Sequence, residues 1–216
     1  FVVPLGGLIQ WNLRPKDRIA CITTSAILLT LLPIIRYGRM AMLDGTQLSA
    51  IALLWFCLSS VSNNRSSKFN FLGAGFACSF MLLLKAPVII PALLAALLPL
   101  LWEHKSKKDF SNLSWHWFFY GLIPGLAWHL WNTFAYGSGA LWMWWGDGAG
   151  RVLFEKGSGS DLGVLVPIIE ILEGGWPWLL LWPIGVLWAC FRFNSRWGAW
   201  ALSTQIIIAG SIFPLK

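Results

Sequence analysis

The sequence predicts an all-α integral membrane protein, a polytopic bundle with about seven complete transmembrane spans and one partial span. Three observations lead to this prediction. Of the 216 residues, 57% are hydrophobic and only 12% are charged, about half the charged fraction of an average soluble domain. Several uninterrupted apolar runs approach the ~20 residues that a helix needs to cross a bilayer. The basic residues gather in short loops between these runs, as expected of loops that orient a membrane protein.

The expected spans follow the apolar runs, so that residues 1–216 form one transmembrane domain. Only helices and closed barrels satisfy the backbone in lipid, and these runs are too long for barrel strands. The partial span is 1–13, and both chain ends are expected to be truncated. The complete spans are 19–35, 46–62, 69–85, 87–102, 115–133, 176–191 and 197–213, with a long glycine-rich loop over 134–175.

The loop charges give the orientation. One set of loops carries ten basic and three acidic residues, whereas the other carries six of each. The positive-inside rule assigns the first set to the cytoplasm. The second set, which contains the loop 134–175, is therefore expected on the extracytoplasmic side. The ten basic residues are Arg14, Lys16, Arg18, Arg65, Lys68, Lys105, Lys107, Lys108, Arg192 and Arg196.

The same distribution argues against a nucleic-acid partner, although the net charge is +7. The expected partner is the lipid bilayer. The four cysteines lie inside apolar runs without CxxC spacing, so neither a disulfide nor a metal site is indicated. No Ser/His/Asp triad and no HExxH motif is present. We predict no metal site and no cofactor; a divalent metal is compatible with the sequence but has no support in it.

The stretch from Arg36 to Gly45 places Arg36, Arg39 and Asp44 between two expected spans. A charge at membrane depth costs roughly 2.5–3.5 kcal/mol, so these residues require an explanation. Arg36 and Arg39 are neighbours on one helical face. Together with Lys85 they would bring three cations to the extracytoplasmic side, where they suit a phosphate group. The alternative for the cations is snorkelling to ordinary lipid headgroups, and that for Asp44 is a role at the N-terminus of the following helix.

In the long loop, Asp147, Arg151 and Glu155 recur at four-residue spacing. If the segment is helical, they form one polar stripe. This stripe either belongs to the phosphate and sugar site or is an exposed salt-bridge ladder. Tryptophans gather near the expected span ends, Trp128, Trp131 and Trp142 among them. We interpret them as interfacial anchors; a sugar-stacking platform at 142–145 is the alternative.

Four segments carry a resemblance to a known family. They are Arg39–Asp44 at a span junction, the turn Leu84-Lys85-Ala86-Pro87, the loop from Trp144 to Glu155, and Gly174-Gly175-Trp176-Pro177-Trp178. In this order they resemble the dolichyl-phosphate-mannose–protein mannosyltransferase-like superfamily of GT-C fold, which includes the bacterial aminoarabinose transferases. The loop is most similar to cyanobacterial members. One departure is Glu155-Lys156, where some relatives have Glu-His.

The resemblance implies a glycosyltransferase in a bacterial inner or plasma membrane. Such enzymes move a sugar from a polyprenyl-phosphate carrier to a protein or lipid acceptor outside the cytoplasm, by an inverting displacement. The resemblance places the principal catalytic carboxylate upstream of residue 1 and gives Asp44 a supporting role. Lys85 and Arg151 would hold the lipid phosphate, and Arg36 and Arg39 would support Asp44.

The alternative function is a polytopic transporter or flippase for polar or lipid-linked cargo. Charged residues inside a helical bundle often mark a substrate pathway. Here, however, the charges gather on one side instead of the bilayer midplane, and no pair of broken helices indicates inverted repeats.

Overall fold

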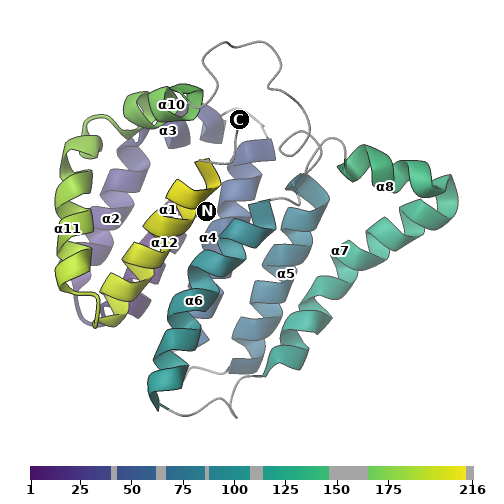
Figure 1. Ribbon diagram of the computed structural model, residues 1–216, viewed down its shortest axis with the longest axis horizontal. Helices are drawn as coiled ribbons and strands as arrows, with labels where there is room; N and C mark the ends of the chain where they lie inside the picture. The colour runs from purple at the N-terminus through teal and green to yellow at the C-terminus, as the bar shows by residue number, and fades with distance from the viewer. Residues whose placement is uncertain (40–42, 62–66, 86–87, 108–113, 146–164, 213–216) are drawn as a thin grey trace.

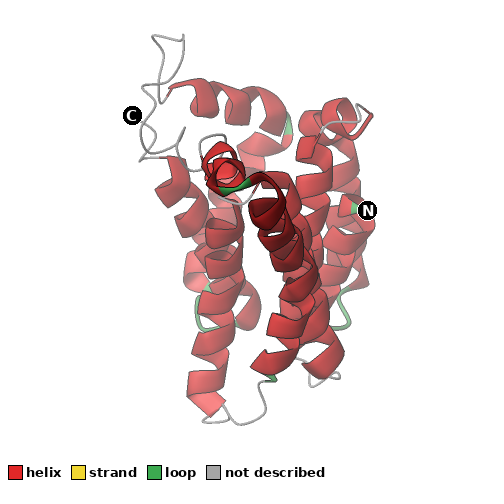
Figure 2. Cartoon of the chain, turned by 90° about the vertical axis from the view of Figure 1, so that its right-hand side faces the viewer, coloured by secondary structure: helices red, strands yellow, loops and turns green. Residues whose placement is uncertain are grey.

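The computed structural model describes residues 1–39, 43–61, 67–85, 88–107, 114–145 and 165–212. Within these residues the chain forms eleven α-helices, one 3-10 helix and no strand (Figure 2). In chain order they are α1 (Val2–Leu13), α2 (Arg18–Thr30), α3 (Leu32–Arg39), α4 (Leu43–Val61), α5 (Ser67–Lys85), α6 (Ile89–Lys107), α7 (Trp115–Tyr136), α8 (Ser138–Trp145), α10 (Leu165–Gly175), the 3-10 helix η3 (Trp178–Leu181), α11 (Trp182–Phe191) and α12 (Arg196–Ile212).

The long helices run up and down beside one another (Figure 1). α4 packs on α1 and α5, α5 packs on α7, and α6 packs on α12. The short helices α3 and α10 lie together across one end of the bundle, which we call the upper end. α4 begins at this end and α5 finishes there, whereas α6 finishes and α7 begins at the opposite, lower end (Figure 1).

A local hydrogen-bond pattern explains where α2 begins. The Asp17 side chain accepts a hydrogen bond from the Ala20 backbone N–H at 2.9 Å, which satisfies one of the donors left open at a helix N-terminus. The same carboxylate lies 2.7 Å from the Arg14 guanidinium. The segment Arg14–Asp17 therefore forms the turn from α1 into α2.

The apolar core lies between α4, α5 and α6. Leu54 and Leu58 of α4, Phe71 and Met81 of α5, and Leu100 of α6 are fully buried. Burial of one such side chain stabilises the fold by about 1.5–3 kcal/mol. These three helices are therefore held mainly by their own side-chain packing.

Small residues bring α7 close to α5. A Cβ atom at Gly121 would lie 2.3 Å from the Leu72 carbonyl oxygen, and one at Gly125 would lie 2.7 Å from the Ser79 carbonyl oxygen. The Gly125 N–H donates to the Ser79 hydroxyl at 2.5 Å, next to Pro124, whose ring interrupts the hydrogen-bond ladder of α7. Any larger residue at Gly121 would force the two helices apart.

The prediction of a polytopic transmembrane bundle is wrong. Within the described residues, none of the helices has both the length and the apolar content that crossing a bilayer requires. This finding corrects the predicted transmembrane spans over 1–216 and the membrane part of the fold class. It also corrects the predicted integral, multi-pass location with an extracytoplasmic active face.

Local sequence features account for the correction. The run 19–35 divides into α2 and α3, because Leu31 is extended at ψ 125° and ends α2. The run 176–191 divides into η3 and the ten-residue α11. The run 115–133 forms one long helix, but the histidine, tyrosine and tryptophan side chains of α7 lower the mean hydropathy of that helix. The predicted loop 134–175 in turn contains α8 and α10.

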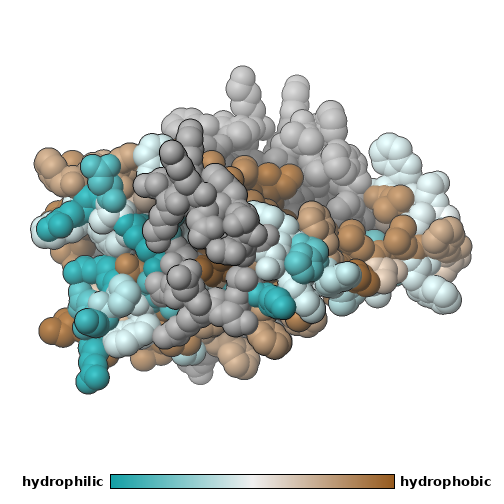
Figure 3. Space-filling model, turned by 90° about the horizontal axis from the view of Figure 1, so that it is seen from below, coloured by the Kyte–Doolittle hydropathy of each residue, from teal (hydrophilic) through white to brown (hydrophobic). Residues whose placement is uncertain are grey.

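Many large apolar side chains remain exposed on the outer helices. Ile19 on α2, Ile90 on α6 and Ile184 on α11 are examples. Large exposed apolar patches mark surfaces that contact another molecule. Viewed from below, hydrophilic side chains gather toward the left, where α11 ends and α12 begins, and the right-hand side with α7 and α8 is brown and pale (Figure 3).

The cysteines provide a test of the packing. Burial raises the pKa of Cys57 to about 11 and that of Cys78 to about 12, whereas Cys190 is exposed. Because the thiolate is the reactive form, we expect a thiol reagent at mildly alkaline pH to label Cys190 in the native protein. Cys57 and Cys78 should react only after unfolding, as peptide mass spectrometry would detect. Rapid labelling of native Cys78 would contradict this packing.

Candidate functional site

The upper end of the bundle carries the first of the predicted site residues. Arg36 lies in α3 and its side chain is exposed. α3 exists as a separate helix because the chain breaks at Leu31 and the helix restarts at Leu32. Pro33 follows in the first turn, where its missing N–H is tolerated. α3 contacts both α4 and α10. Because of this break, α3, which carries Arg36, lies across the upper end of the bundle.

Asp44 lies in the first turn of α4 and is exposed. It is the second residue of the helix, so it is not the residue that precedes the helix as a cap. A carboxylate in the first turn interacts favourably with the helix dipole, by about 0.3–1 kcal/mol. This stabilisation is compatible with an additional role toward a ligand, because the side chain is accessible from solvent.

Each of these two charged residues has an exposed leucine one turn away. Leu32 lies four residues before Arg36 in α3, and Leu48 lies four residues after Asp44 in α4. Residues four apart lie on the same helical face. The upper end therefore presents a cation, a carboxylate and exposed apolar groups on adjoining helices. We call these four residues the amphiphilic patch.

A corner of the chain brings α10 close to α3, the helix that carries Arg36. A Cβ atom at Gly174 would lie 2.6 Å from Pro33, so glycine allows α10 to approach α3 closely. The Trp178 indole N–H donates to the Thr30 hydroxyl at 2.8 Å. The segment Gly174–Trp178, which the sequence singled out as a motif, thus contacts the junction of α2 and α3 next to Arg36.

The other predicted site residues are placed less fully. Arg39 is the last residue of α3 and Lys85 the last of α5, which finishes at the upper end (Figure 1). Asp147, Arg151 and Glu155 lie outside the described residues. The structure therefore brings Arg36 and Asp44 to one end of the bundle, together with the helix ends that carry Arg39 and Lys85.

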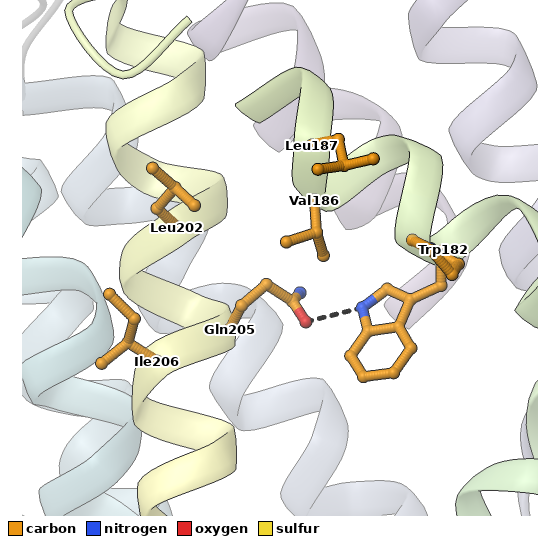
Figure 4. A pocket seen from close by; sticks show the side chains of 7 residues that line it. Trp182, Val186, Leu187, Leu202, Gln205 and Ile206 are labelled. Atoms are coloured by element: carbon orange, nitrogen blue, oxygen red, sulfur yellow. Dashed lines mark hydrogen bonds between the residues drawn. The ribbon is translucent and has the colours of Figure 1, made fainter. Parts of the chain in front are cut away.

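Two apolar grooves occur elsewhere on the bundle. One, of about 560 Å³, lies between α11 and α12, where the Trp182 indole N–H donates to the Gln205 amide oxygen at 2.7 Å (Figure 4). The other, of about 590 Å³, lies between α1 and α2 and is lined by Trp11, Cys21 and Leu29 among others. Of the predicted site residues whose side chains the structure describes, neither Arg36 nor Asp44 lines either groove.

The lower end contains a polar cluster that the sequence did not predict. The Arg196 Nε lies 3.1 Å from a Glu103 carboxylate oxygen, with side-chain exposures of 20% and 12%. Arg196 also donates to the backbone carbonyls of Asn12, at 2.9 Å, and of Ser59. Burial lowers the pKa of Arg196, and the Glu103 carboxylate opposes that shift. One guanidinium therefore connects α1, α4, α6 and α12.

Buried amide and hydroxyl groups complete this cluster. The Asn12 side-chain amide donates to the Ser59 hydroxyl at 3.1 Å and to the Ser60 hydroxyl at 2.7 Å. Both arginine-bound carbonyls belong to the last turns of α1 and α4, where the helix dipole favours a cation. No short-range sequence pattern predicts such a cluster, because its members are far apart in sequence.

The part of the chain that the structure describes contains no group of three or more His, Cys, Asp or Glu side chains suited to a metal ion.

The chain was compared with protein families, curated proteins and solved structures, and none of them matched. The predicted resemblance to the mannosyltransferase-like superfamily thus rests on the quoted residues alone.

The cluster at the lower end is testable by a double-mutant cycle. We expect Arg196→Gln and Glu103→Gln each to lower the free energy of unfolding by about 2 kcal/mol, between the values of exposed and fully buried pairs. The double variant should lose less than the sum. The measurement is denaturant unfolding.

Arg14→Gln is the matched control, since its pair with Asp17 is more exposed and should contribute less than about 1 kcal/mol. Equal losses for Arg14→Gln and Arg196→Gln would contradict the structural role of the cluster.

Proposed function

We propose that the chain is part of a glycosyltransferase that takes a sugar from a polyprenyl-phosphate carrier and gives it to a protein or lipid acceptor. The observation that carries the proposal is the amphiphilic patch, in which Arg36 and Asp44 stand beside exposed Leu32 and Leu48. A polyprenyl-phosphate sugar has the matching chemistry: an anionic phosphate, a polar sugar and a long apolar chain.

The charged groups have different roles in this proposal. Arg36 binds the phosphate, since a guanidinium can donate two parallel hydrogen bonds to it. Lys85 and Arg39, the last residues of α5 and α3, add positive charge toward the same anion. As the acceptor hydroxyl oxygen attacks the anomeric carbon, it gives its proton to the catalytic carboxylate that the resemblance implies, the bond from that carbon to the phosphate oxygen breaks, and polyprenyl phosphate leaves. The cations stabilise the charge that develops on that leaving group.

Asp44 has a supporting role in this proposal. Its carboxylate accepts hydrogen bonds from sugar hydroxyl groups and so orients the donor or the acceptor. Correct orientation of the reacting groups accounts for a large part of the rate in such bimolecular reactions. The sequence segment between α8 and α10 supplies further proposed contributors to the sugar and phosphate site, because their four-residue spacing predicts one polar stripe. They are Asp147, Arg151 and Glu155.

A transporter or flippase gains no support from the described residues. Arg36 and Asp44 lie at one end of the bundle, whereas a pathway through it would require polar groups along its length. The buried Arg196 cluster lies at the opposite end and is held by helix carbonyls.

Substitution of Asp44 tests the proposal in the intact protein. We expect Asp44→Asn to lower kcat for sugar transfer from a polyprenyl-phosphate donor by about 100-fold. The free energy of unfolding should change by less than about 1 kcal/mol. Asp44→Glu keeps the favourable charge in the first turn of α4 but moves the carboxylate. Full activity of both variants would mean that Asp44 serves only the helix.

Substitution of Arg36 should affect the donor instead. We expect Arg36→Gln to raise KM for the polyprenyl-phosphate donor by about tenfold or more, since a charge-assisted hydrogen bond contributes roughly 1.5–3 kcal/mol. Arg18→Gln is the matched control, an exposed arginine at the start of α2. The proposal fails for Arg36 if the two variants have the same KM.

A further inference from the structure

The second half of α7 and the helix α8 form an exposed aromatic surface. Its most exposed members are Trp131 at 72%, Phe134 at 85%, Tyr136 at 77% and Trp142 at 70%. We call the segment from Trp128 to Trp142 the aromatic arm. In Figure 1 α8 lies at the right-hand edge of the molecule, away from the centre of the bundle.

The arm is also free of formal charge. Residues 115–145 contain no Asp, Glu, Lys or Arg, so all 25 such residues of the chain lie elsewhere. A protein surface that faces only water normally intersperses charges of both signs. Residues 115–145 instead form an uncharged stretch of sequence, and the right-hand side of Figure 3, where α7 and α8 lie, is brown and pale.

The polar side chains of the arm make hydrogen bonds to helix backbones. The Asn132 amide donates to the Trp128 carbonyl at 2.9 Å, and the Thr133 hydroxyl donates to the His129 carbonyl at 2.8 Å. The His129 ring lies 3.2 Å from the Leu82 carbonyl of α5. A carbohydrate site would need such groups to bind sugar hydroxyls. Because these polar groups already form hydrogen bonds within the protein, an apolar or interfacial partner is favoured over a carbohydrate.

We propose that the aromatic arm docks against the headgroup interface of a lipid surface, with zwitterionic lipids as its partner. Tryptophan and tyrosine prefer this layer, because their rings are apolar while the indole N–H and the phenol O–H still reach water. An arm without charge has no electrostatic preference for anionic lipid. The arm lies on the interface and does not cross the bilayer, and this inference is independent of the proposed catalytic function.

The attachment of the arm leaves its aromatic face open. α7 is fastened to α5 through Gly121, Gly125 and the ring of His129, and α8 continues from α7 through Gly137. This glycine has φ 73° and ψ −171°, a conformation that essentially only glycine adopts. The chain therefore turns from α7 into α8 at this glycine, and the exposed rings of α7 and α8 remain available to lipid.

Vesicle flotation of the intact protein tests the docking. We expect it to float with phosphatidylcholine vesicles to the same extent at low and at high salt. Trp131→Ala and Trp142→Ala should each lower the partition coefficient by about tenfold, since each removes a large apolar ring. Trp142→Lys should lower it at least as much. Circular dichroism and thermal unfolding check that each variant is folded.

Trp102→Ala is the matched control, because Trp102 is 56% exposed but lies on α6 next to the charged Glu103; its partition coefficient should change by less than about twofold. Binding that requires anionic lipid and is lost at high salt would overturn the proposal. Equal effects of Trp102→Ala and Trp142→Ala would also overturn it. So would protection of Trp142 from oxidation by a soluble oligosaccharide but not by vesicles, which would make the arm a sugar platform.

Discussion

The guanidinium of Arg196 holds the lower ends of four helices together, alongside the apolar packing of α4, α5 and α6. It pairs with Glu103 and donates to carbonyls at the ends of α1 and α4, so it joins four helices at the lower end. α4 has 19 residues and is therefore roughly 28 Å long. Because a helix of this length behaves as a rod, fixing its last turn near Ser59 also limits where its first turn, with Asp44, can lie.

Some of the fold was predictable from local sequence. The expected run 69–85 matches α5 (Ser67–Lys85), and 197–213 matches α12 (Arg196–Ile212) closely, because charged loops bound these apolar runs. The prediction of transmembrane spans was wrong because it rested on apolar composition and did not detect local breaks. At Leu31, for example, the apolar run 19–35 becomes two helices. The Glu103–Arg196 pair was assigned to loops, since no local pattern links residues that lie so far apart.

The candidate site was predicted in part. The sequence marked Arg36 and Asp44 because charges stood between apolar runs, and the structure adds the exposed leucines beside them and the contact of α3 with α10. The leucines carried no signal of their own, since exposure depends on how the helices pack. Charge and apolar surface thus meet at the upper end, and an uncharged aromatic surface lies on α7 and α8. Together they would suit an amphiphilic substrate presented at a lipid interface.

Photo-crosslinking would show whether the upper end of the bundle binds a polyprenyl phosphate. A polyprenyl phosphate with a photoreactive group next to the phosphate would be irradiated with the intact protein, and the labelled peptides would be identified by mass spectrometry. We expect labelling between residues 32 and 48, reduced by excess unlabelled polyprenyl phosphate. Labelling confined to the grooves of α1–α2 or α11–α12, with none at 32–48, would contradict it.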